Sequence, residues 1–263
     1  AHHRYIHSFP TRRSSDLRGI LFLSSPFDEQ SADFLADLGM SAFKVPSGEL
    51  INLPFLAHLA AKGRPLILST GMAHLGEVEA AVQAVAAAGP VPLALLQCVS
   101  NYPADPADVN LRAMDTMAAA FGVAVGYSDH VPQNEVAFAA VARGACIVEK
   151  HFTLDRNLPG PDHQASLEPG ELAALVRGIR AVEAALGDGR KRPAASEADT
   201  AAVARKSLVA ACDIPVGSVL AAELIAVKRP GSGLPPAMLP HLLGRRTRVT
   251  IPRDALLTLE DLL

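Results

Sequence analysis

The sequence predicts an α/β protein in which helices cover a parallel sheet, followed by a small β-rich domain. Short apolar runs alternate with amphipathic segments, and these runs are too uniformly apolar to face water on either side of a sheet. Beyond Ala204 this alternation gives way to short β-like runs and turns. A chain of 263 residues is long enough for one large domain and one small one.

Six apolar runs are expected to form strands, and each ends in a small polar or charged cluster. In chain order they cover residues 20–25, 42–45, 65–70, 93–99, 123–128 and 145–152. The expected helices cover residues 30–38, 53–62, 75–88, 134–143 and 169–186. Because the carboxyl ends of parallel strands build the active site in such folds, six strand ends would supply polar groups to one rim. A closed barrel of this type has eight strand–helix units, which is two more than the six strands predicted here.

The C-terminal part is expected to form a separate domain. Residues 187–203 lose their periodicity and predict a linker, which leaves residues 18–186 as the large domain and residues 204–263 as the small one. Within the small domain, residues 213–225 match residues 250–262, with Ile, Pro, Leu and Glu at equal spacing. This short repeat predicts two halves related by a pseudo-twofold axis.

Charge and composition exclude several classes of protein. A net charge of -3 provides no basic field for nucleic acid or an anionic membrane, and no apolar run approaches the length of a membrane-spanning helix. Cys98, Cys146 and Cys212 lie far apart in apolar runs, which predicts reduced core or near-core thiols in a cytoplasmic protein. We therefore expect small-molecule substrates, and neither nucleic acid nor a membrane as a partner.

Two histidines follow consecutive expected strands, His130 and His151. Neighbouring strands lie about 4.8 Å apart, so the two imidazoles could share one divalent metal ion and leave coordination positions open. Alternation along each strand places Ser128 on the face of His130, and Glu149 on the face of His151. The alternative is that these are rim histidines paired with Asp129 or Glu149.

Lys44 lies in an otherwise apolar strand, where a buried and unpaired ammonium group would be costly. It could reach solvent, or it could face an anion together with serine hydroxyls at the strand ends. These serines are Ser25, Ser47, Ser69 and Ser128, and each could instead be an ordinary helix N-cap. Glu49 is either a polar contact for a sugar or an acid in the first turn of a helix.

Two further segments carry charged residues beside Pro and Gly. Residues 154–169 form a long loop on the same rim, which holds Asp155, Arg156, Asp162 and His163. Such loops often cover a substrate, although a solvated connection is the simpler alternative. In the small domain Lys228 and Arg229 precede a Gly-rich turn. This segment is either an exposed basic turn, or it places the Arg229 guanidinium on the substrate.

Together these segments resemble the sialic acid synthase family. The resemblance rests on FKVPSGEL, LSTGM, GYSDH, EKHFTLDRNLPGPDHQAS and VKRPGSG, and it is continuous from Gly19 to Leu263. It implies a (β/α)8 TIM barrel joined to a C-terminal antifreeze-like (SAF) domain of the β-clip type. It also implies an enzyme that condenses phosphoenolpyruvate with N-acetylmannosamine to give N-acetylneuraminate and phosphate. The alternatives are a legionaminate synthase that uses a diacetylamino-hexose and, third, a pseudaminate synthase, which more often has Phe in place of Gly48.

The resemblance assigns expected roles to individual residues. His130 and His151 would bind the divalent ion, Mn²⁺ or Mg²⁺. Phosphoenolpyruvate would be held by Ser25, Lys44, Ser47, Ser69, Ser128 and either Ser100 or Asn101. The open-chain sugar would contact Glu49, Tyr102 and Asp162. Arg229 would reach the barrel of a partner subunit in a domain-swapped homodimer.

The N-terminal segment FPTRRSSDL, residues 9–17, is rich in Arg and Ser like a transit peptide but has no amphipathic stripe. Back-translated together with residues 7 and 8, it matches a common short-read sequencing adapter. The family's first two βα units have no counterpart here, and residues 20–27 match its third strand. We therefore expect residues 1–17 to be an artefact without stable contacts to the core, and little or no turnover from the chain as it stands.

Three other interpretations stay open. A metal-dependent barrel hydrolase is the rival enzyme class, although no His-x-His strand motif and no clear third ligand occur beyond residue 17. A non-catalytic protein could bind sugar through residues 204–263 alone. An inactive fragment of a synthase is the third.

Overall fold

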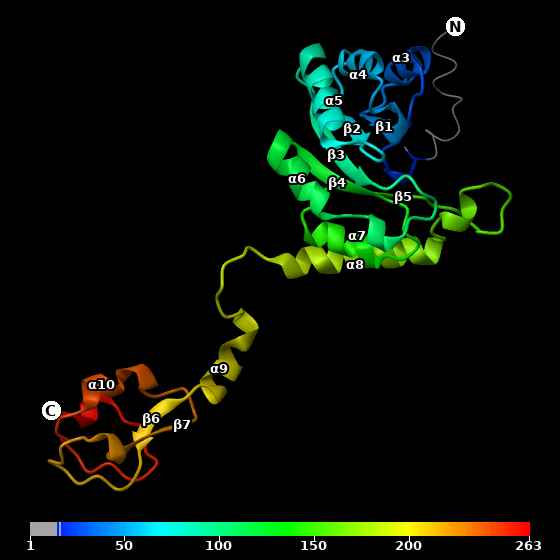
Figure 1. Cartoon of the computed structure of the whole chain (residues 1–263). Coiled ribbons are helices and arrows are strands. Elements are labelled where there is room, and N and C mark those ends of the chain that lie inside the picture. The colour runs from blue at the N-terminus through cyan, green and yellow to red at the C-terminus, as the bar shows by residue number, and fades with distance from the viewer. Residues whose placement is uncertain (1–14, 16) are drawn as a thin grey trace. The chain divides into compact units, whose positions relative to one another are not determined.

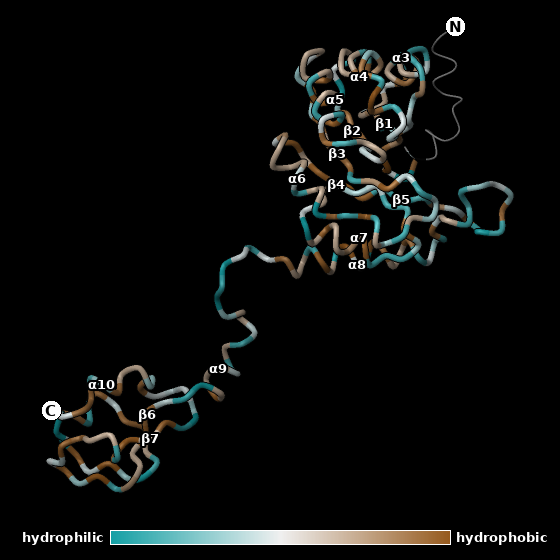
Figure 2. Tube along the Cα trace, viewed as in Figure 1, coloured by the Kyte–Doolittle hydropathy of each residue, from teal (hydrophilic) through white to brown (hydrophobic). Residues whose placement is uncertain are grey.

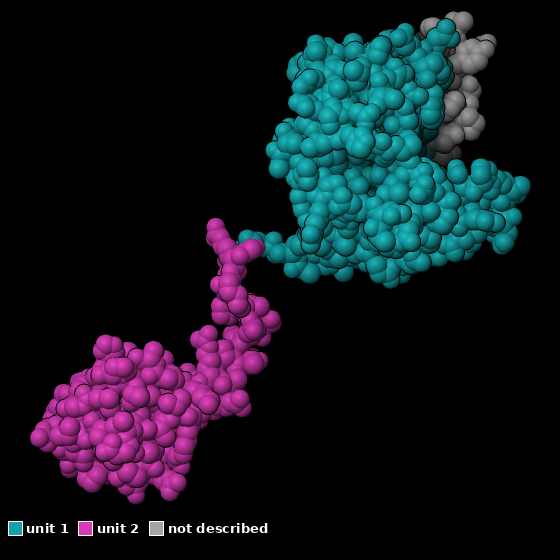
Figure 3. Space-filling view, viewed as in Figure 1, with its two compact units in different colours: residues 1–188 teal, residues 189–263 magenta. Residues whose placement is uncertain are grey.

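The computed structural model describes residue 15 and residues 17–263, which belong to two separate units (Figure 1, Figure 3). Unit 1 ends at Asp188 and unit 2 begins at Gly189. The expectation that residues 1–17 make no stable contacts falls almost entirely outside the described residues. Among the residues described, no helix is long and apolar enough to cross a membrane.

Unit 1 is built on a parallel sheet of five strands that lie in chain order. They are β1 (Phe43–Val45), β2 (Leu66–Ser69), β3 (Leu93–Cys98), β4 (Ala124–Asp129) and β5 (Val148–Lys150). Each strand pairs with the next in parallel, as in Lys44 with Ile67 and Ser128 with Glu149. The predicted parallel α/β architecture is therefore confirmed.

One of the six expected strands, residues 20–25, is not formed, so the prediction for this segment is wrong. The Ser24 amide points to the Met40 Sδ at 3.1 Å instead of to a carbonyl of β1, and no ladder with β1 develops. Ile20 and Leu21 are exposed side chains. A strand at the edge of a sheet needs a regular row of backbone partners, and this segment lacks one among the described residues.

Helices alternate with the strands of unit 1. They are α3 (Glu29–Asp37), α4 (Leu53–Ala60), α5 (Leu75–Ala88), α6 (Arg112–Phe121), α7 (Glu135–Ala142) and α8 (Pro169–Leu186). In Figure 1 helices α3 to α5 lie next to β1 and β2, and α7 and α8 next to β4 and β5. The start of α3 is set by Asp28, whose carboxylate accepts the Ser31 amide at 2.7 Å, and α8 starts with a capping box formed by Glu168 and Glu171.

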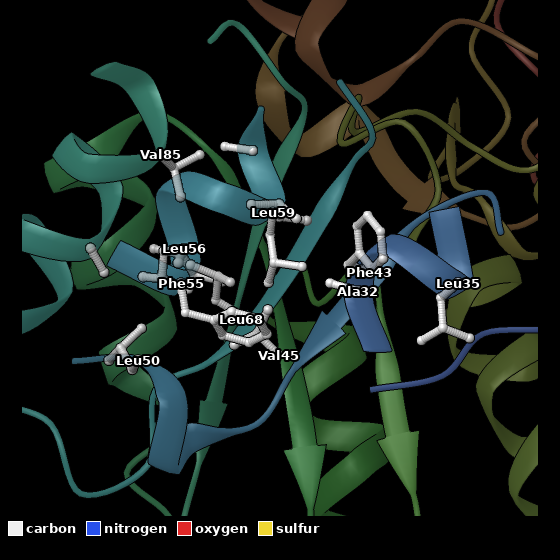
Figure 4. Packing of buried hydrophobic residues seen from close by; sticks show 14 of the residues in the cluster. Ala32, Leu35, Phe43, Val45, Leu50, Phe55, Leu56, Leu59, Leu68 and Val85 are labelled. Atoms are coloured by element: carbon white, nitrogen blue, oxygen red, sulfur yellow. The ribbon is translucent and has the colours of Figure 1, made fainter. Parts of the chain in front are cut away.

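The core of unit 1 lies between the first strands and their helices. Figure 4 shows Phe43 and Val45 of β1 packed near Leu56 and Leu59 of α4, and all four are fully buried. Burial of each such side chain contributes about 1.5–3 kcal/mol. Because side chains alternate along a strand, Lys44 points to the opposite face of β1, away from these helices. Figure 2 shows the hydrophobic residues of β3 within the same unit.

Unit 2 contains helix α9 (Ala198–Ala204), the antiparallel pair β6 (Ser207–Ala210) and β7 (Ile225–Lys228), and the short helix α10 (Leu239–Leu242). Helix α9 occupies the second part of the segment expected to be an irregular linker. The predicted internal repeat is confirmed: Ile214 and Ile251, at equivalent positions of the two repeats, exchange two hydrogen bonds of 2.8 Å. The 3-10 helices at residues 222–224 and 259–261 also occupy equivalent positions.

The three cysteines are free, but only Cys98 is buried. The expectation of core or near-core thiols is therefore wrong for Cys146 and Cys212. Cys146 precedes β5, which has only β4 as a neighbour among the described strands, and its thiol donates to the Val125 carbonyl at 3.1 Å. Cys212 lies in a turn of unit 2.

Candidate active site

A cavity of about 280 Å³ lies at the carboxyl ends of the strands of unit 1. Every strand contributes to it, in chain order through Lys44, Ser69, Cys98, Ser128 and Glu149. The remaining lining residues are Lys150, the last residue of β5, and six residues of the chain that flanks the strands, namely Ser25, Pro46, Ser47, Tyr102, His130 and His151. The structure thus gathers most of the candidate residues into one site.

One side of the cavity presents a positive charge that is already paired. The Lys44 ammonium lies 3.4 Å from Glu149 Oε2 and donates to the Val45 carbonyl at 3.0 Å, and its side chain is only 13% exposed. Ser128 donates to the same Glu149 oxygen at 2.7 Å. Lys44 therefore faces the cavity and does not extend into solvent. An incoming anion would meet a cation, a hydroxyl and a carboxylate that are linked to one another.

Three hydroxyls gather next to this cation, around the Gly71 backbone. The Gly71 amide donates to Ser47 Oγ at 3.0 Å, and a Cβ atom at Gly71 would lie only 2.3 Å from Ser100 Oγ. Ser69 is 2% exposed, and none of the described residues hydrogen-bonds to its hydroxyl. Buried hydroxyls are nearly always bonded, so an open one that lines a cavity fits a ligand oxygen. Between the two alternatives for this position, Ser100 lies in the cluster and Asn101 is exposed.

The opposite side of the cavity holds the two histidines, with ring centroids 5.4 Å apart. His130 donates its Nδ1–H to the Val99 carbonyl at 2.6 Å, and His151 Nδ1 lies 4.0 Å from Asp162 Oδ2. The bond to Val99 leaves the Nε2 atom of His130 for a ligand, and the Asp162 carboxylate lies on the Nδ1 side of His151, as in metal sites where a second partner orients the imidazole. The Tyr102 ring lies over His130 at 4.0 Å and meets His151 edge-on at 5.3 Å.

The histidines are not rim residues paired with a strand carboxylate. Asp129 accepts from Lys150 at 2.7 Å and from the Val131 amide at 2.9 Å, and Glu149 is bound by Ser128 and Lys44. Neither carboxylate is a hydrogen-bond partner of His130 or His151. The alternative stated for these histidines from the sequence is therefore wrong.

This donor set fits a divalent ion with open coordination positions. No cluster of three His, Cys, Asp or Glu side chains suited to a metal occurs in the described part of the chain, so a closed structural site is not what these residues form. Burial, helped by the neighbouring His130, lowers the pKa of His151, which favours the neutral imidazole that metals bind. Burial alone would lower the pKa of His130 too, but its contacts with Cys98 and Val99 outweigh burial and raise it.

Five expected site residues lie outside the cavity lining, namely Ser100 and Asn101, described above, and Glu49, Asp162 and Arg229. Asp162 reaches only its edge, beside His151. Glu49 accepts from the Asn52 amide at 2.8 Å in a 3-10 turn after β1. Arg229 is an exposed residue of unit 2, directly before the turn that contains Gly231.

Four lining residues were not among the predicted binding or catalytic residues, namely Pro46, Cys98, Glu149 and Lys150. Cys98 lies 3.9 Å from His130 Nδ1; burial would raise the pKa of its thiol, but the contact with His130 and two serine hydroxyls outweighs burial and lowers it. Lys150 forms an ion pair with Asp129, and these side chains are 4% and 0% exposed. The sequence carries a usable signal for this pair, since Asp129 immediately precedes His130 and Lys150 immediately precedes His151.

Comparison with known proteins agrees with this geometry. Residues 10–191 match the model of the NeuB family and residues 205–263 match that of the SAF domain. The first match begins within the segment expected to be artefactual.

Three similar proteins illustrate the relationship. N,N'-diacetyllegionaminic acid synthase of Legionella pneumophila is 44% identical over 248 residues, which cover 93% of this chain and 70% of that protein. Human N-acetylneuraminate-9-phosphate synthase is 40% identical over 245 residues, covering 92% of this chain and 68% of that one. The crystal structure of the N-acetylneuraminic acid synthetase from Leptospira borgpetersenii, in complex with citrate, is 38% identical with a TM-score of 0.66 and covers 72% of this chain and 66% of that one.

The family models match most of the chain, and the proteins named above resemble it in sequence and, for the solved structure, in fold. The chain belongs to the NeuB family of nonulosonic acid synthases and carries a C-terminal SAF domain.

Proposed function

We propose that the cavity binds phosphoenolpyruvate together with an open-chain N-acylated hexosamine and joins them into a nonulosonic acid with release of phosphate. One observation carries the proposal: a cation, an open buried hydroxyl and a pair of oriented imidazoles share a single cavity, at Lys44, Ser69, His130 and His151. A phosphorylated carboxylic acid needs the cation of Lys44 and the open hydroxyl of Ser69. An aldehyde needs an electrophilic centre, which the imidazole pair can hold.

The anionic substrate is held by positioning and electrostatics. The Lys44 ammonium and the hydroxyls of Ser47, Ser69 and Ser100 offer charge-assisted and neutral hydrogen bonds to phosphate and carboxylate oxygens. These groups sit on strand ends whose backbone is fixed by the sheet, so little reorganisation accompanies binding. Ser25 and Ser128 complete the lining on either side.

The second substrate binds on the histidine side. The chemistry that a divalent ion, Mn²⁺ or Mg²⁺, supplies when bound at His130 and His151 is polarisation of the sugar aldehyde. Tyr102 closes the site over both imidazoles, and Asp162 and Glu49 offer carboxylates to the sugar hydroxyls from the adjoining loops. The enol carbon then attacks the aldehyde carbon, water adds at C2, and phosphate leaves by C–O cleavage.

Two sugars are candidates for this site. The resemblance first implies N-acetylmannosamine, with N-acetylneuraminate as the product. The higher identity to the Legionella synthase, whose product is N,N'-diacetyllegionaminic acid, favours a diacetylamino-hexose. We further propose a cytoplasmic homodimer in which Arg229 of the SAF domain reaches the cavity of a partner subunit.

Replacing Lys44 by Met is expected to weaken the binding of phosphoenolpyruvate by roughly 10- to 100-fold. A hydrogen bond to a charged group contributes about 1.5–3 kcal/mol, and Met keeps the length of the side chain without its charge. Calorimetric titration of the purified chain with phosphoenolpyruvate measures the change. Lys62→Met, which removes an ammonium from a surface ion pair with Asp33, is the matched control. Equal affinity of the Lys44 and Lys62 variants would contradict the assignment of the cavity.

Gly71→Ala is expected to weaken phosphoenolpyruvate binding by about tenfold, because the new methyl group fills the space shared by Ser47 and Ser100. The atoms that it meets are hydroxyl ends of side chains, so the free energy of unfolding should change little. Gly48→Ala is the control, since a Cβ atom there meets nothing within 4 Å. The same titration, with thermal unfolding alongside, separates binding from stability; a full-affinity Gly71 variant would exclude this cluster from the site.

The reaction itself is tested by product identification. The chain is incubated with Mn²⁺, phosphoenolpyruvate and either sugar, and phosphate and product masses are measured. We expect phosphate and the condensation product, at whatever turnover the chain supports. Phosphoenolpyruvate that remains intact with both sugars would overturn the proposed function.

A further inference from the structure

The loop after β5 closes on itself beside His151. Phe152 and Leu167 form a parallel bridge, the Leu167 amide donates to the His151 carbonyl at 2.9 Å, and the Thr153 amide donates to the Leu167 carbonyl at 2.9 Å. Both ends of the loop are therefore fixed at the rim of the cavity, from which the loop projects in Figure 1. Its interior holds the residues around Asp162.

A buried threonine is bonded to an imidazole inside this loop. Thr153 is 4% exposed, and its Oγ1 lies 2.7 Å from His163 Nδ1. The Asp155 carbonyl lies 3.1 Å from Thr153 Oγ1, and a hydroxyl that donates its proton to this carbonyl accepts from the His163 ring. We therefore expect His163 to be the tautomer that carries its proton on Nδ1. Gly160 lies against the same ring, where a Cβ atom would come within 2.9 Å of Cδ2, and its φ of 149° suits glycine.

A second buried hydroxyl fixes the backbone of Asp162. Ser166 is 3% exposed, and its Oγ donates to the Asp162 carbonyl at 2.7 Å. The Asp162 side chain itself is 61% exposed, so burial does not hold its carboxylate in place. Its position 4.0 Å from His151 Nδ1 is set by the chain on either side, which Ser166 and His163 tie down.

We propose that Thr153 and His163 are positioning residues that hold the Asp162 carboxylate against His151. The carboxylate then orients the His151 ring so that its Nε2 faces the cavity, as carboxylates do for histidine ligands in metal sites. The inference rests on the proposed role of His151 as a metal ligand. The inference adds that part of the metal affinity originates in the hydrogen bond between Thr153 and His163. This bond is remote from the metal, and His163 touches neither substrate.

The first test is spectroscopic and needs no metal. A long-range ¹H–¹⁵N spectrum of the histidine-labelled chain reports which ring nitrogen of His163 carries the proton, and His163→Gln identifies the signals. We expect a neutral ring protonated on Nδ1, and loss of this signature in Thr153→Val. A ring protonated on Nε2 in the wild-type chain would overturn the inference.

The second test measures Mn²⁺ affinity by electron paramagnetic resonance of the free ion. Thr153→Val and Asp162→Asn are each expected to weaken binding by about tenfold, the lower end of the effect of outer-shell partners. The double variant should be no weaker than Asp162→Asn alone, because both changes remove the same interaction. Thr153→Ser, which retains the hydroxyl, should bind as the wild type does, and Thr116→Val on the exposed face of α6 serves as the matched control.

The outcomes separate the inference from the proposed function. If Asp162→Asn weakens binding and Thr153→Val does not, or if neither variant changes it, the inference is wrong and the metal site stands. If the wild-type chain binds no Mn²⁺, the proposed metal site fails. In that case the His151 ring resonances decide the inference: Thr153→Val must shift them as Asp162→Asn does, and unchanged resonances would contradict it.

Discussion

Replacing Lys150 by Met is expected to destabilise unit 1 by about 3–5 kcal/mol, the usual result of leaving a buried charge without its partner. Lys150 and Asp129 are neighbours in the register of β4 and β5, and their side chains are almost fully buried. The Lys150 ammonium also donates to the carbonyls of Val131 and Gln133, so it holds the chain directly after His130. Met fills the volume but removes the cation from the buried Asp129 carboxylate, which keeps only uncharged donors such as the Val131 amide.

Tyrosine fluorescence during urea unfolding measures this effect. The chain has no Trp, and all three Tyr residues precede Gly189, where unit 2 begins, so the signal is not confused by unit 2. Arg180→Met, which breaks an exposed ion pair with Glu183, should change the stability far less, because exposed ion pairs contribute little. The double variant Asp129→Asn/Lys150→Met should recover most of the lost stability, because no unpaired charge is left buried. A Lys150 variant no less stable than the Arg180 variant would show that the pair is not buried in solution.

His130→Ala and His151→Ala are each expected to weaken Mn²⁺ binding by more than about 100-fold. Loss of an outer-shell partner alone costs about 10- to 100-fold, and these changes would remove one of only two imidazoles. Because the Nδ1 atom of His130 is already bonded to the Val99 carbonyl, this ring is oriented before the ion arrives, and the Asp162 carboxylate lies near Nδ1 of His151. Pre-orientation of this kind lowers the cost of binding.

The matched control for the histidine variants is His58→Ala. His58 lies in the same unit but is bonded to Asp33 on the surface of α4, far from the strand ends in sequence. Titration followed by the resonance of free Mn²⁺ should show wild-type affinity for this variant. Similar Mn²⁺ affinities for the His58, His130 and His151 variants would show that the two cavity histidines do not bind the ion. The proposed reaction would then lack its electrophile.

Much of this architecture could be predicted from the sequence because it depends on local pattern. Strands such as β3 and β4 are apolar on both faces, and that pattern alone indicates a parallel sheet between helices. Polar residues at strand ends meet at one rim in such a sheet, which is why Lys44, Ser69, Ser128 and His130 could be grouped from the sequence alone. The repeat of unit 2 was visible because the two halves share their spacing of Ile, Pro, Leu and Glu.

What could not be predicted depends on contacts between distant residues. Residues 20–25 have the composition of a strand, but strand formation depends on a partner row, and the Ser24 amide points to Met40 instead. The pairing of Lys150 with Asp129 depends on the register of β4 and β5, for which the only signal in the sequence is that each residue directly precedes one of the two histidines. The bond between Thr153 and His163 depends on how a loop folds back, for which no periodic pattern exists.

The structure of the chain bound to phosphoenolpyruvate and Mn²⁺ tests the central claim most directly, namely that this cavity is the synthase site. We expect phosphoenolpyruvate to lie between the Lys44 ammonium and the Ser69 hydroxyl, with the ion bound by the Nε2 atoms of His130 and His151. Phosphoenolpyruvate bound elsewhere, or an ion bound without these two histidines, would contradict the claim.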